Sequence, residues 1–470
     1  ARVFFNGTQM TSDGGNSEVN KMRFFILITL ITFNSFAIDE SMVVNSVLNN
    51  FPLIEAEMLK AKAVEGDKIE AEGSFDFVLK AKAKIWRQDP YDNDYYDAYL
   101  EKQTAFGGMK VKAGHRKGIG DFNYYAQDLE TSRAGQAYVG FMTPLLRNLE
   151  TDEYRTKLEI TKIKEVIAKE KIKVKKLISI HKALSLYYKY LFELKKLKIN
   201  QEILSLAEKR QKFIETKFRA GSESKFKLIE NTRILNKRQA EVMKTEAELI
   251  QIETELSLYV REKNGTPIKF NRDSEPEDKL EVISAKIFKS IDQNPHLKIL
   301  TLEKQILNTE KRYNEQSKLP GLNLDVTGYK ELSNRARYQD NILQVGVFFD
   351  LPLENRKAEG SSVASLYRLK ALEKELTFLK DQLDQQFDAS FRSGLLAKER
   401  WQVAKKEYET AKYLVKGETK KWEMGSSTLF TVNLREQDLA DIETRVWYAL
   451  YEFHQYRLDS GLFTASLVEF

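Results

Sequence analysis

The sequence predicts an α+β protein in which long antiparallel helical hairpins are joined to short strands of alternating polarity, twice per chain. The first observation is a stretch without Pro or Gly over 148–218, in a chain of 470 residues with only 8 prolines, which leaves room for very long helices. The second is a set of segments that alternate apolar and polar residues at period two. The third is that the same order of elements occurs twice.

The composition excludes several chemistries. The chain has no cysteine, so it holds no disulfide, thiolate metal site or cysteine nucleophile. Its 4 histidines disfavour a multi-histidine metal site, and no phosphate-binding or dinucleotide-binding glycine motif occurs. The carboxylates of the helices interleave with lysines at three- and four-residue spacing, as in solvated ion pairs. We therefore predict no catalytic, metal-binding or cofactor-binding residue, and no enzyme.

The N-terminal segment predicts export. A basic flank around Met22, an apolar stretch over 24–33 and a small-x-small ending at Ala37 are typical of a signal peptide spanning 22–37. We interpret 1–21 as a leader that is not native to the mature protein. Nothing downstream offers 18 consecutive apolar residues, so membrane residence would require a β-barrel.

The mature part divides into two repeats. The first, 38–262, contains a helix, strands over about 74–146 and a helical hairpin over about 148–262. The second, 277–462, contains a helix, strands over about 320–353 and a hairpin over about 355–460. A linker, 263–276, separates them, and 463–470 forms a C-terminal tail. The distance from a Pro-Leu element to a turn glycine is 77 residues in the first repeat (221 − 144) and 73 in the second (425 − 352).

Both hairpins carry heptad patterns that predict coiled-coil packing. In the first, the positions are Val174, Leu177, His181, Leu184, Tyr188 and Leu191; in the second, Leu369, Leu372, Leu376, Leu379 and Leu383. At such a position we expect His181 to be a hydrogen-bonded interface residue.

The predicted strands alternate apolar and polar residues. In the first, Lys80, Lys82 and Lys84 form the polar face opposite a row of apolar residues. Such a strand suits either a half-buried sheet or a membrane barrel with a wet lumen, and export together with two long hairpins favours the barrel. The three lysines either line a positive lumen or simply face water. The aromatic residues between Trp86 and Tyr99 suggest an interfacial girdle.

This arrangement resembles the outer membrane efflux protein (TolC-like) family over 38–462. The resemblance rests on the duplicated order of elements and on two glycine turns, Phe218–Ser224 and Trp422–Thr428. It implies a homotrimer in the bacterial outer membrane, with strands from three copies in one barrel and helices forming a tunnel through the periplasm. It also implies a periplasmic adaptor protein and an inner-membrane pump as partners. We expect Ser222 and Ser426 to cap the outgoing helices.

The resemblance assigns residues to two regions near the turns. Those expected to dock the adaptor are Arg219, Gly221, Ser222, Ser224, Met424, Gly425, Ser426 and Ser427. Those at the positions where family members often place acidic constriction residues are Lys227, Thr431 and Leu434, so an acidic gate is not supported there.

The first strand region departs from the family pattern. It is 35 residues longer than the second, because Pro52 to Pro144 spans 92 residues and Pro295 to Pro352 spans 57. The surplus predicts an extra hairpin, which either gives six strands per chain or forms an extracellular cap.

The function that follows is a porin-like exit duct, passively conducting substrates out of a tripartite efflux or type I secretion system and contacting outer-membrane lipid. The alternative is a structural coiled-coil protein bridging envelope layers. Nucleic-acid binding is not predicted, because acidic residues interrupt the lysine run 169–176 of an exported chain.

Overall fold

The computed structural model describes residues 38–270, 272, 290–332 and 341–469. The predicted leader and signal peptide, and part of the predicted linker, lie outside the described residues. Residues 38–470 form one unit.

Six antiparallel strands form one sheet in the order of the chain, β1-β2-β3-β4-β5-β6. Their bounds are β1 Phe77–Gln88, β2 Tyr91–Gln103, β3 Lys110–Gly120, β4 Gln136–Pro144, β5 Gly321–Glu331 and β6 Asn341–Asp350. The surplus of the first strand region therefore lies within the sheet, where β2 and β3 pair from Asn93↔Gly120 to Gln103↔Lys110.

Seven α-helices make up most of the other residues that the structure describes. Their bounds are α1 Glu40–Asn50, α2 Pro52–Gly73, α3 Glu153–Arg219, α4 Lys225–Ser257, α5 Pro295–Gln316, α6 Arg356–Glu423 and α7 Leu429–Phe463. The described residues also include the short 3-10 helices η1 Tyr124–Leu129, η3 Ile291–Gln293 and η4 Ser466–Glu469. The two longest helices, α3 and α6, have 67 and 68 residues, as their lack of internal proline allows.

Local sequence accounts for where these helices begin. Pro52 and Pro295 occupy the first helical position of α2 and α5, where a missing amide N–H costs nothing. Asp152 caps α3, because its side chain accepts a hydrogen bond from the backbone N of Arg155.

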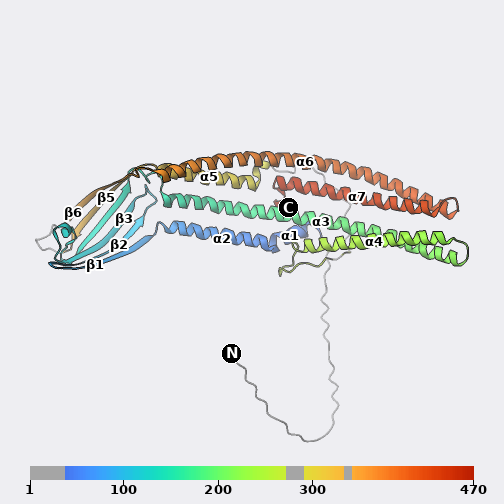
Figure 1. The fold of residues 1–470 in the computed structure, drawn as a ribbon, viewed down its shortest axis with the longest axis horizontal. Coiled ribbons are helices and arrows are strands. Elements are labelled where there is room, and N and C mark those ends of the chain that lie inside the picture. The colour runs from blue at the N-terminus through green and yellow to red at the C-terminus, as the bar shows by residue number, and fades with distance from the viewer. Residues whose placement is uncertain (1–37, 271, 273–289, 333–340, 470) are drawn as a thin grey trace, which may run out of the picture. The chain divides into compact units, whose positions relative to one another are not determined.

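The sheet lies at one end of the unit and the helical hairpins α3/α4 and α6/α7 extend away from it, their turns at the far end (Figure 1). Helices α2 and α5 run beside α3 and α6 in the half nearer the sheet (Figure 1). The hairpin turns are neighbours, since the rings of Phe213 on α3 and Trp422 on α6 are in edge contact with centroids 6.1 Å apart.

The main core lies where α1 and the ends of α4 and α7 pack against the middle of α3. Its largest fully buried members are Val43, Val47, Leu177, Ile180, Leu184, Tyr190, Leu194, Leu249, Leu256, Val260 and Leu458. The heptad residues Leu177, Leu184 and Tyr188 are buried there, and His181 Nε2 lies 2.7 Å from Asp459 Oδ1 on α7. The heptad pattern thus marks the packed stripe of α3.

None of the helices in the described part of the chain combines the length and the apolar character needed to cross a lipid bilayer.

Candidate functional site: the two-faced sheet and the helical turns

The strand register sorts the side chains of the sheet onto two chemically different faces. One face, called here the apolar face, includes Leu79, Leu100, Val139, Val326, Leu343, Val345 and Val347. Its residues are widely exposed in the single chain, with Leu79 and Leu343 each 72% and Val139 68% exposed. These residues come from β1, β2, β4, β5 and β6, and an exposed apolar surface of this extent marks a contact with an apolar partner.

The opposite face, called here the polar face, carries a network of charged and phenolic side chains. Lys80 Nζ lies 2.8 Å from Glu101 Oε1, and Lys112 Nζ lies 3.1 Å from Asp325 Oδ2. Tyr138 donates its hydroxyl hydrogen to Asp97 Oδ1 at 2.8 Å. These bonds link β1 to β2, β3 to β5 and β4 to β2, so they hold the strands through their side chains as well as their backbones.

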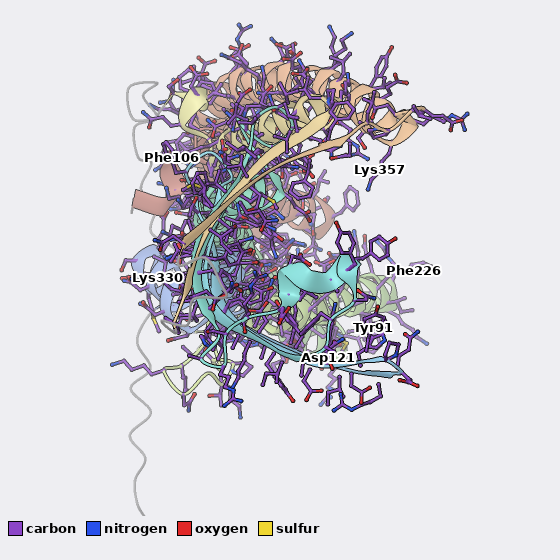
Figure 2. The ribbon with its side chains drawn as sticks, turned by 90° about the vertical axis from the view of Figure 1, so that its left-hand side faces the viewer. Tyr91, Phe106, Asp121, Phe226, Lys330 and Lys357 are labelled. Atoms are coloured by element: carbon purple, nitrogen blue, oxygen red, sulfur yellow. The ribbon has the colours of Figure 1, made fainter. Side chains whose placement is uncertain are left out.

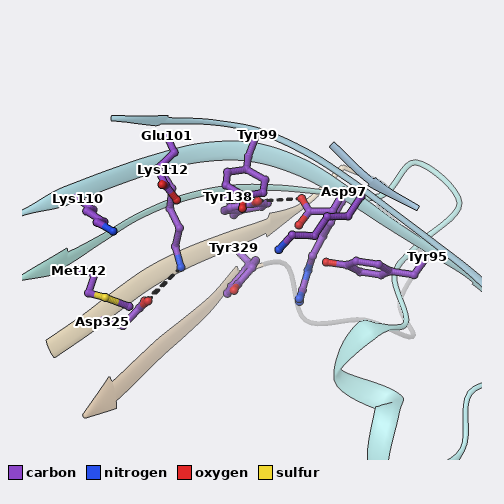
Figure 3. A pocket seen from close by; sticks show the side chains of 12 residues that line it. Tyr95, Asp97, Tyr99, Glu101, Lys110, Lys112, Tyr138, Met142, Asp325 and Tyr329 are labelled. Atoms are coloured by element: carbon purple, nitrogen blue, oxygen red, sulfur yellow. Dashed lines mark hydrogen bonds and ion pairs between the residues drawn. The ribbon is translucent and has the colours of Figure 1, made fainter. Parts of the chain in front are cut away.

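A pocket of about 220 Å³ opens on the polar face. It is lined by Lys82, Tyr95, Asp97, Tyr99, Glu101, Lys110, Lys112, Arg116, Tyr138, Met142, Asp325 and Tyr329 (Figure 3). Tyrosine rings and cations alternate there, with the Lys82 ammonium 5.3 Å from the centre of the Tyr99 ring and the Arg116 guanidinium 4.2 Å from that of Tyr329.

The predicted lysines all lie on the polar face. Lys80 is neutralised by Glu101, Lys82 stands over Tyr99, and Lys84 is opposite Tyr95 in the register. The interpretation of the region from Trp86 to Tyr99 as a girdle on the outer surface is wrong for most of its residues. The tyrosines lie inside β2, and the register places Tyr95 and Tyr99 on the polar face because each is two residues from Asp97.

The two hairpin turns have the same geometry. Gly221 and Gly425 adopt positive φ angles of 74° and 76°, which glycine tolerates at a helix C-terminus. The amide N–H of Ser222 donates to Lys217 O at 2.9 Å, and that of Ser426 donates to Lys421 O at 2.8 Å. Both turns are therefore Schellman motifs, which satisfy the last carbonyls of α3 and α6.

The expectation that Ser222 and Ser426 cap the outgoing helices is wrong. Each serine closes the preceding helix, and its hydroxyl donates to the same carbonyl at 3.0 Å. The caps come two residues later, where Ser224 accepts from Lys227 N and Thr428 accepts from Thr431 N. The Schellman turn needs the residue after the glycine to close the first helix, so the second helix begins further along.

The other predicted turn residues lie around these motifs. Arg219 ends α3, Met424 is the 75%-exposed C-cap of α6, and the Ser427 hydroxyl donates to Glu418. Lys227 forms an ion pair with Glu223 at 2.9 Å. Thr431 contacts Thr428 at 2.8 Å between hydroxyl oxygens, and Leu434 is about half exposed.

Two exposed phenylalanines accompany the turns and were missed by sequence reasoning. Phe226 is 86% and Phe430 60% exposed, and each follows its turn glycine by five residues (226 − 221 and 430 − 425). The equal spacing from glycine to phenylalanine in the two turns is visible in the sequence and could have identified these residues. Together with Met424 they give the turns an apolar surface.

A buried ionic cluster near the turns was also missed. Arg210 of α3 and Arg238 of α4 both contact the carboxylate of Glu436 on α7, with nearest N–O distances of 2.6 and 3.4 Å. Burial lowers the pKa of the Arg238 guanidinium, and this effect exceeds the opposing effect of the Glu436 carboxylate beside it. The cluster connects the two hairpins a few turns of helix above their tips.

The acidic residues that interrupt the lysine run 169–176 form ion pairs with lysines. Glu165 bonds both Lys169 and Lys68 of α2, and these two ammonium groups lower its pKa to about 2. Glu170 bonds Lys173 and Lys298 of α5. No group of three or more His, Asp or Glu side chains suited to a metal ion occurs in the described ranges.

Comparison with solved structures identifies the fold. The CmeC outer membrane channel of Campylobacter jejuni matches with a TM-score of 0.67 and 11% sequence identity, over 91% of this chain and 85% of that chain. The outer membrane protein VceC of Vibrio cholerae matches with a TM-score of 0.66 and 12% identity, over 91% and 95% of the two chains. The MtrE outer membrane channel of Neisseria gonorrhoeae matches with a TM-score of 0.64 and 10% sequence identity, over 91% of this chain and 88% of that chain.

No protein-family model and no curated protein matches the chain in sequence. The chain has the fold of the outer-membrane efflux channels, and the resemblance drawn from the sequence is confirmed for that fold. At 10–12% identity the likeness lies in the architecture.

Proposed function

We propose that this protein is the outer-membrane exit duct of a tripartite efflux or type I secretion system, conducting substrates passively from the periplasm and an inner-membrane pump to the exterior. The two-faced sheet is the observation that carries the proposal. Its apolar face requires an apolar partner, which lipid supplies, and its polar face then borders water. A soluble sheet would instead bury its apolar face against helices of the same chain.

The sheet supports assembly from several copies. Within the described residues, β1 and β6 each pair on one side only, which leaves two unpaired edges. Pairing β6 of one copy with β1 of the next would remove those edges. Three copies, as the family resemblance implies, would place 18 strands (3 × 6) around one barrel, and barrels of about 16–18 strands enclose an aqueous channel.

The hairpins and their turns support the remaining roles. Helices of 67 and 68 residues extend about 100 Å, which suits a tunnel through the periplasm. The turns Phe218–Ser224 and Trp422–Thr428 would dock a periplasmic adaptor, with the exposed Phe226 and Phe430 giving apolar anchorage. Lys227, Thr431 and Leu434 follow the turns and would lie nearest the periplasmic constriction.

The polar face also suggests a charge preference. If it lines the channel, Lys82 and Lys84 add positive potential, while Lys80 contributes less because Glu101 neutralises it. Anions would then be conducted in preference to cations. If these lysines face open water away from the conduction path, no such preference arises.

Single-channel recording of detergent-purified residues 38–470 in a planar lipid bilayer tests the duct directly. We expect stable conductance steps, with anion preference if the lysines line the path. A folded protein that is extracted without detergent and gives no steps would contradict the duct and favour the alternative, a coiled-coil protein that bridges envelope layers.

A further inference from the structure

The connection between β3 and β4 is much longer than a hairpin needs. Residues 121–135 give it 15 residues, whereas β1 and β2 are joined by the two residues Asp89 and Pro90. Hairpin loops usually take two to five residues. The surplus length, which includes η1, folds back over the sheet; in Figure 2 this short helix lies in the concavity of the curved strands, away from Lys330 on the convex side.

The face that this connection covers is the polar face. Gly118 belongs to it, because the register places Gly118 opposite Tyr95 on the neighbouring strand. A Cβ added to Gly118 would lie 2.0 Å from the carbonyl oxygen of Leu129 and 3.0 Å from the Phe122 ring. The loop backbone therefore rests directly on the sheet, and only glycine leaves room for it there.

Several buried bonds hold the connection in place. Thr131 is 5% exposed, and its hydroxyl oxygen accepts a hydrogen bond from Gly118 N at 3.0 Å. The backbone N of Ser132 donates to Glu331 Oε2 of β5 at 3.1 Å, and Arg116 donates to Asp128 O at 3.1 Å. At the other end, Asp121 N donates to Asp92 O at 2.8 Å. These anchors come from β2, β3 and β5, so the loop is fixed to the polar face.

The anchored loop presents two tyrosines to open space. Tyr124 and Tyr125 are 80% and 93% exposed, and their rings meet edge to face with centroids 5.9 Å apart. The loop also carries three carboxylates, Asp121, Asp128 and Glu130, against the single cation Arg133. Its net charge of −2 differs in sign from that of the lysines on β1.

We propose that residues 121–135 form a constriction loop, called here the eyelet, that narrows the outer mouth of the duct. Tyr124 and Tyr125 lie at the edge of the opening that it leaves. This inference rests on the proposed function, because the polar face lines the conduction path only if the sheet closes around it. The connection follows the ends of β3 and β4 that are remote from the helices, which places it at the exterior end of the duct. Substrates leaving the duct would pass this ring of phenols and carboxylates last.

Two glycines of the polar face provide a matched test. Gly118→Ala forces the loop off the sheet, because the added methyl group meets the Leu129 backbone. Gly346→Ala adds the same methyl group to the polar face of β6, where the nearest atom is 3.4 Å away on the Phe348 ring. We expect Gly118→Ala to raise single-channel conductance about twofold and Gly346→Ala to leave it unchanged. Tyr124→Ala with Tyr125→Ala should raise it similarly without disturbing the fold, because both side chains are exposed.

The absence of cysteine allows a second test, since one introduced thiol is labelled uniquely. A bulky charged methanethiosulfonate reagent should lower the conductance of Tyr125→Cys in steps. The same reagent on Lys330→Cys should leave conductance unchanged, because the register places Lys330 beside Ala137 on the apolar face at the same end of the sheet.

The outcomes separate the two proposals. Wild-type protein that gives no conductance steps overturns the duct and the eyelet together. Wild-type protein that conducts, with unchanged conductance in Gly118→Ala, in the double tyrosine variant and in labelled Tyr125→Cys, overturns the eyelet alone. The eyelet is supported if conductance rises in Gly118→Ala and in the double tyrosine variant and falls in labelled Tyr125→Cys.

Discussion

The guanidinium of Arg210 on α3 and the carboxylate of Glu436 on α7 form an ion pair, with Nη2 and Oε1 2.6 Å apart and both side chains less than a tenth exposed. Arg238 of α4 contacts the second oxygen of the same carboxylate at 3.4 Å and also donates to Ile203 O at 2.7 Å. One carboxylate therefore holds two buried cations and connects both helical hairpins. Removing it leaves both cations without their counter-charge.

Glu436→Gln should lower the free energy of unfolding by about 3–5 kcal/mol, the usual cost of breaking a buried ion pair from one side. Chemical denaturation followed by circular dichroism measures this loss. Glu407→Gln is the control, because its ion pair with Arg445 also joins two helices but both side chains are about half exposed. For Glu407→Gln we expect the free energy of unfolding to fall by only about 0–1 kcal/mol. Equal losses in the two variants would contradict a special role for the buried cluster.

The helices and strands were predictable because their patterns repeat over many residues. Proline-free length and heptad leucines identify α3 and α6, and alternation identifies β1, β5 and β6. The extra hairpin was expected from the length difference between the two strand regions. Its place inside the sheet was one of two alternatives, and the sequence did not decide between them, since pairing depends on contacts between residues far apart in the chain, such as Lys112 with Asp325.

The features that sequence reasoning missed arise from tertiary packing. Arg210, Arg238 and Glu436 each look like an ordinary charged helix residue, and only the packing of three helices buries them together. The loop 121–135 has the composition of an ordinary surface loop, and contacts between residues far apart in the chain, such as Ser132 with Glu331, reveal that it rests on the sheet. The prediction that Ser222 and Ser426 cap the outgoing helices was wrong because the local sequence is ambiguous. A serine after a turn glycine can cap the next helix or close the preceding one in a Schellman motif.

The turn glycines should respond to alanine differently from the helical glycines. At Gly221 an added Cβ meets no atom within 4 Å, so the cost of Gly221→Ala is the positive φ alone, about 1–2 kcal/mol. Gly417 lies within α6 and also has open space around it. Gly417→Ala should therefore stabilise the protein by about 0.5–1 kcal/mol. Thermal unfolding of the two variants decides the signs, and a stabilised Gly221→Ala would contradict the turn geometry.

Bulkier changes at the same turns should affect transport. Gly221→Leu and Gly425→Leu add a side chain to the surface proposed to dock the adaptor. We expect both variants to reach the membrane as oligomers and to export poorly, as measured by substrate efflux in cells. Gly66→Leu, in α2 with open space around it, is the matched control and should export normally. Wild-type export in both turn variants would remove the docking assignment.

A buried histidine should make stability depend on pH. His454 is 7% exposed and stacks on Tyr188 with ring centroids 4.0 Å apart. Burial, and then the charge of Arg457, lowers the pKa of His454 to about 3. In the unfolded chain its pKa is about 6.5, so between these values the unfolded chain binds a proton that the folded chain does not. The free energy of unfolding should therefore fall as the pH drops below about 6.5, by up to about 1.4 kcal/mol per pH unit.

His454→Phe isolates this contribution, because phenylalanine keeps a ring against Tyr188 and cannot be protonated. Denaturant titrations at pH 7.5, 6 and 5 should give a flatter pH profile for the variant than for the wild type. Burial also lowers the pKa of His296, so His296→Gln should flatten the profile in the same direction. An unchanged slope in His454→Phe would show that this histidine is not the source of the dependence.

Two adjacent residues of β6 test the proposal that the apolar face of the sheet meets lipid. Val347 and Phe348 are 64% and 55% exposed and point to opposite faces, Val347 opposite Leu324 on the apolar face and Phe348 opposite Asn323 on the polar face. Val347→Lys would place an ammonium group in hydrocarbon, at a cost of about 2 kcal/mol per copy. Phe348→Lys would place the same group in water on the polar face, where it costs little. We expect membrane fractionation to find less assembled oligomer for Val347→Lys and a wild-type amount for Phe348→Lys. Because the two changes differ by one position along one strand, the reverse result would require the polar face to meet lipid, and equal assembly would mean that neither face is buried in the membrane.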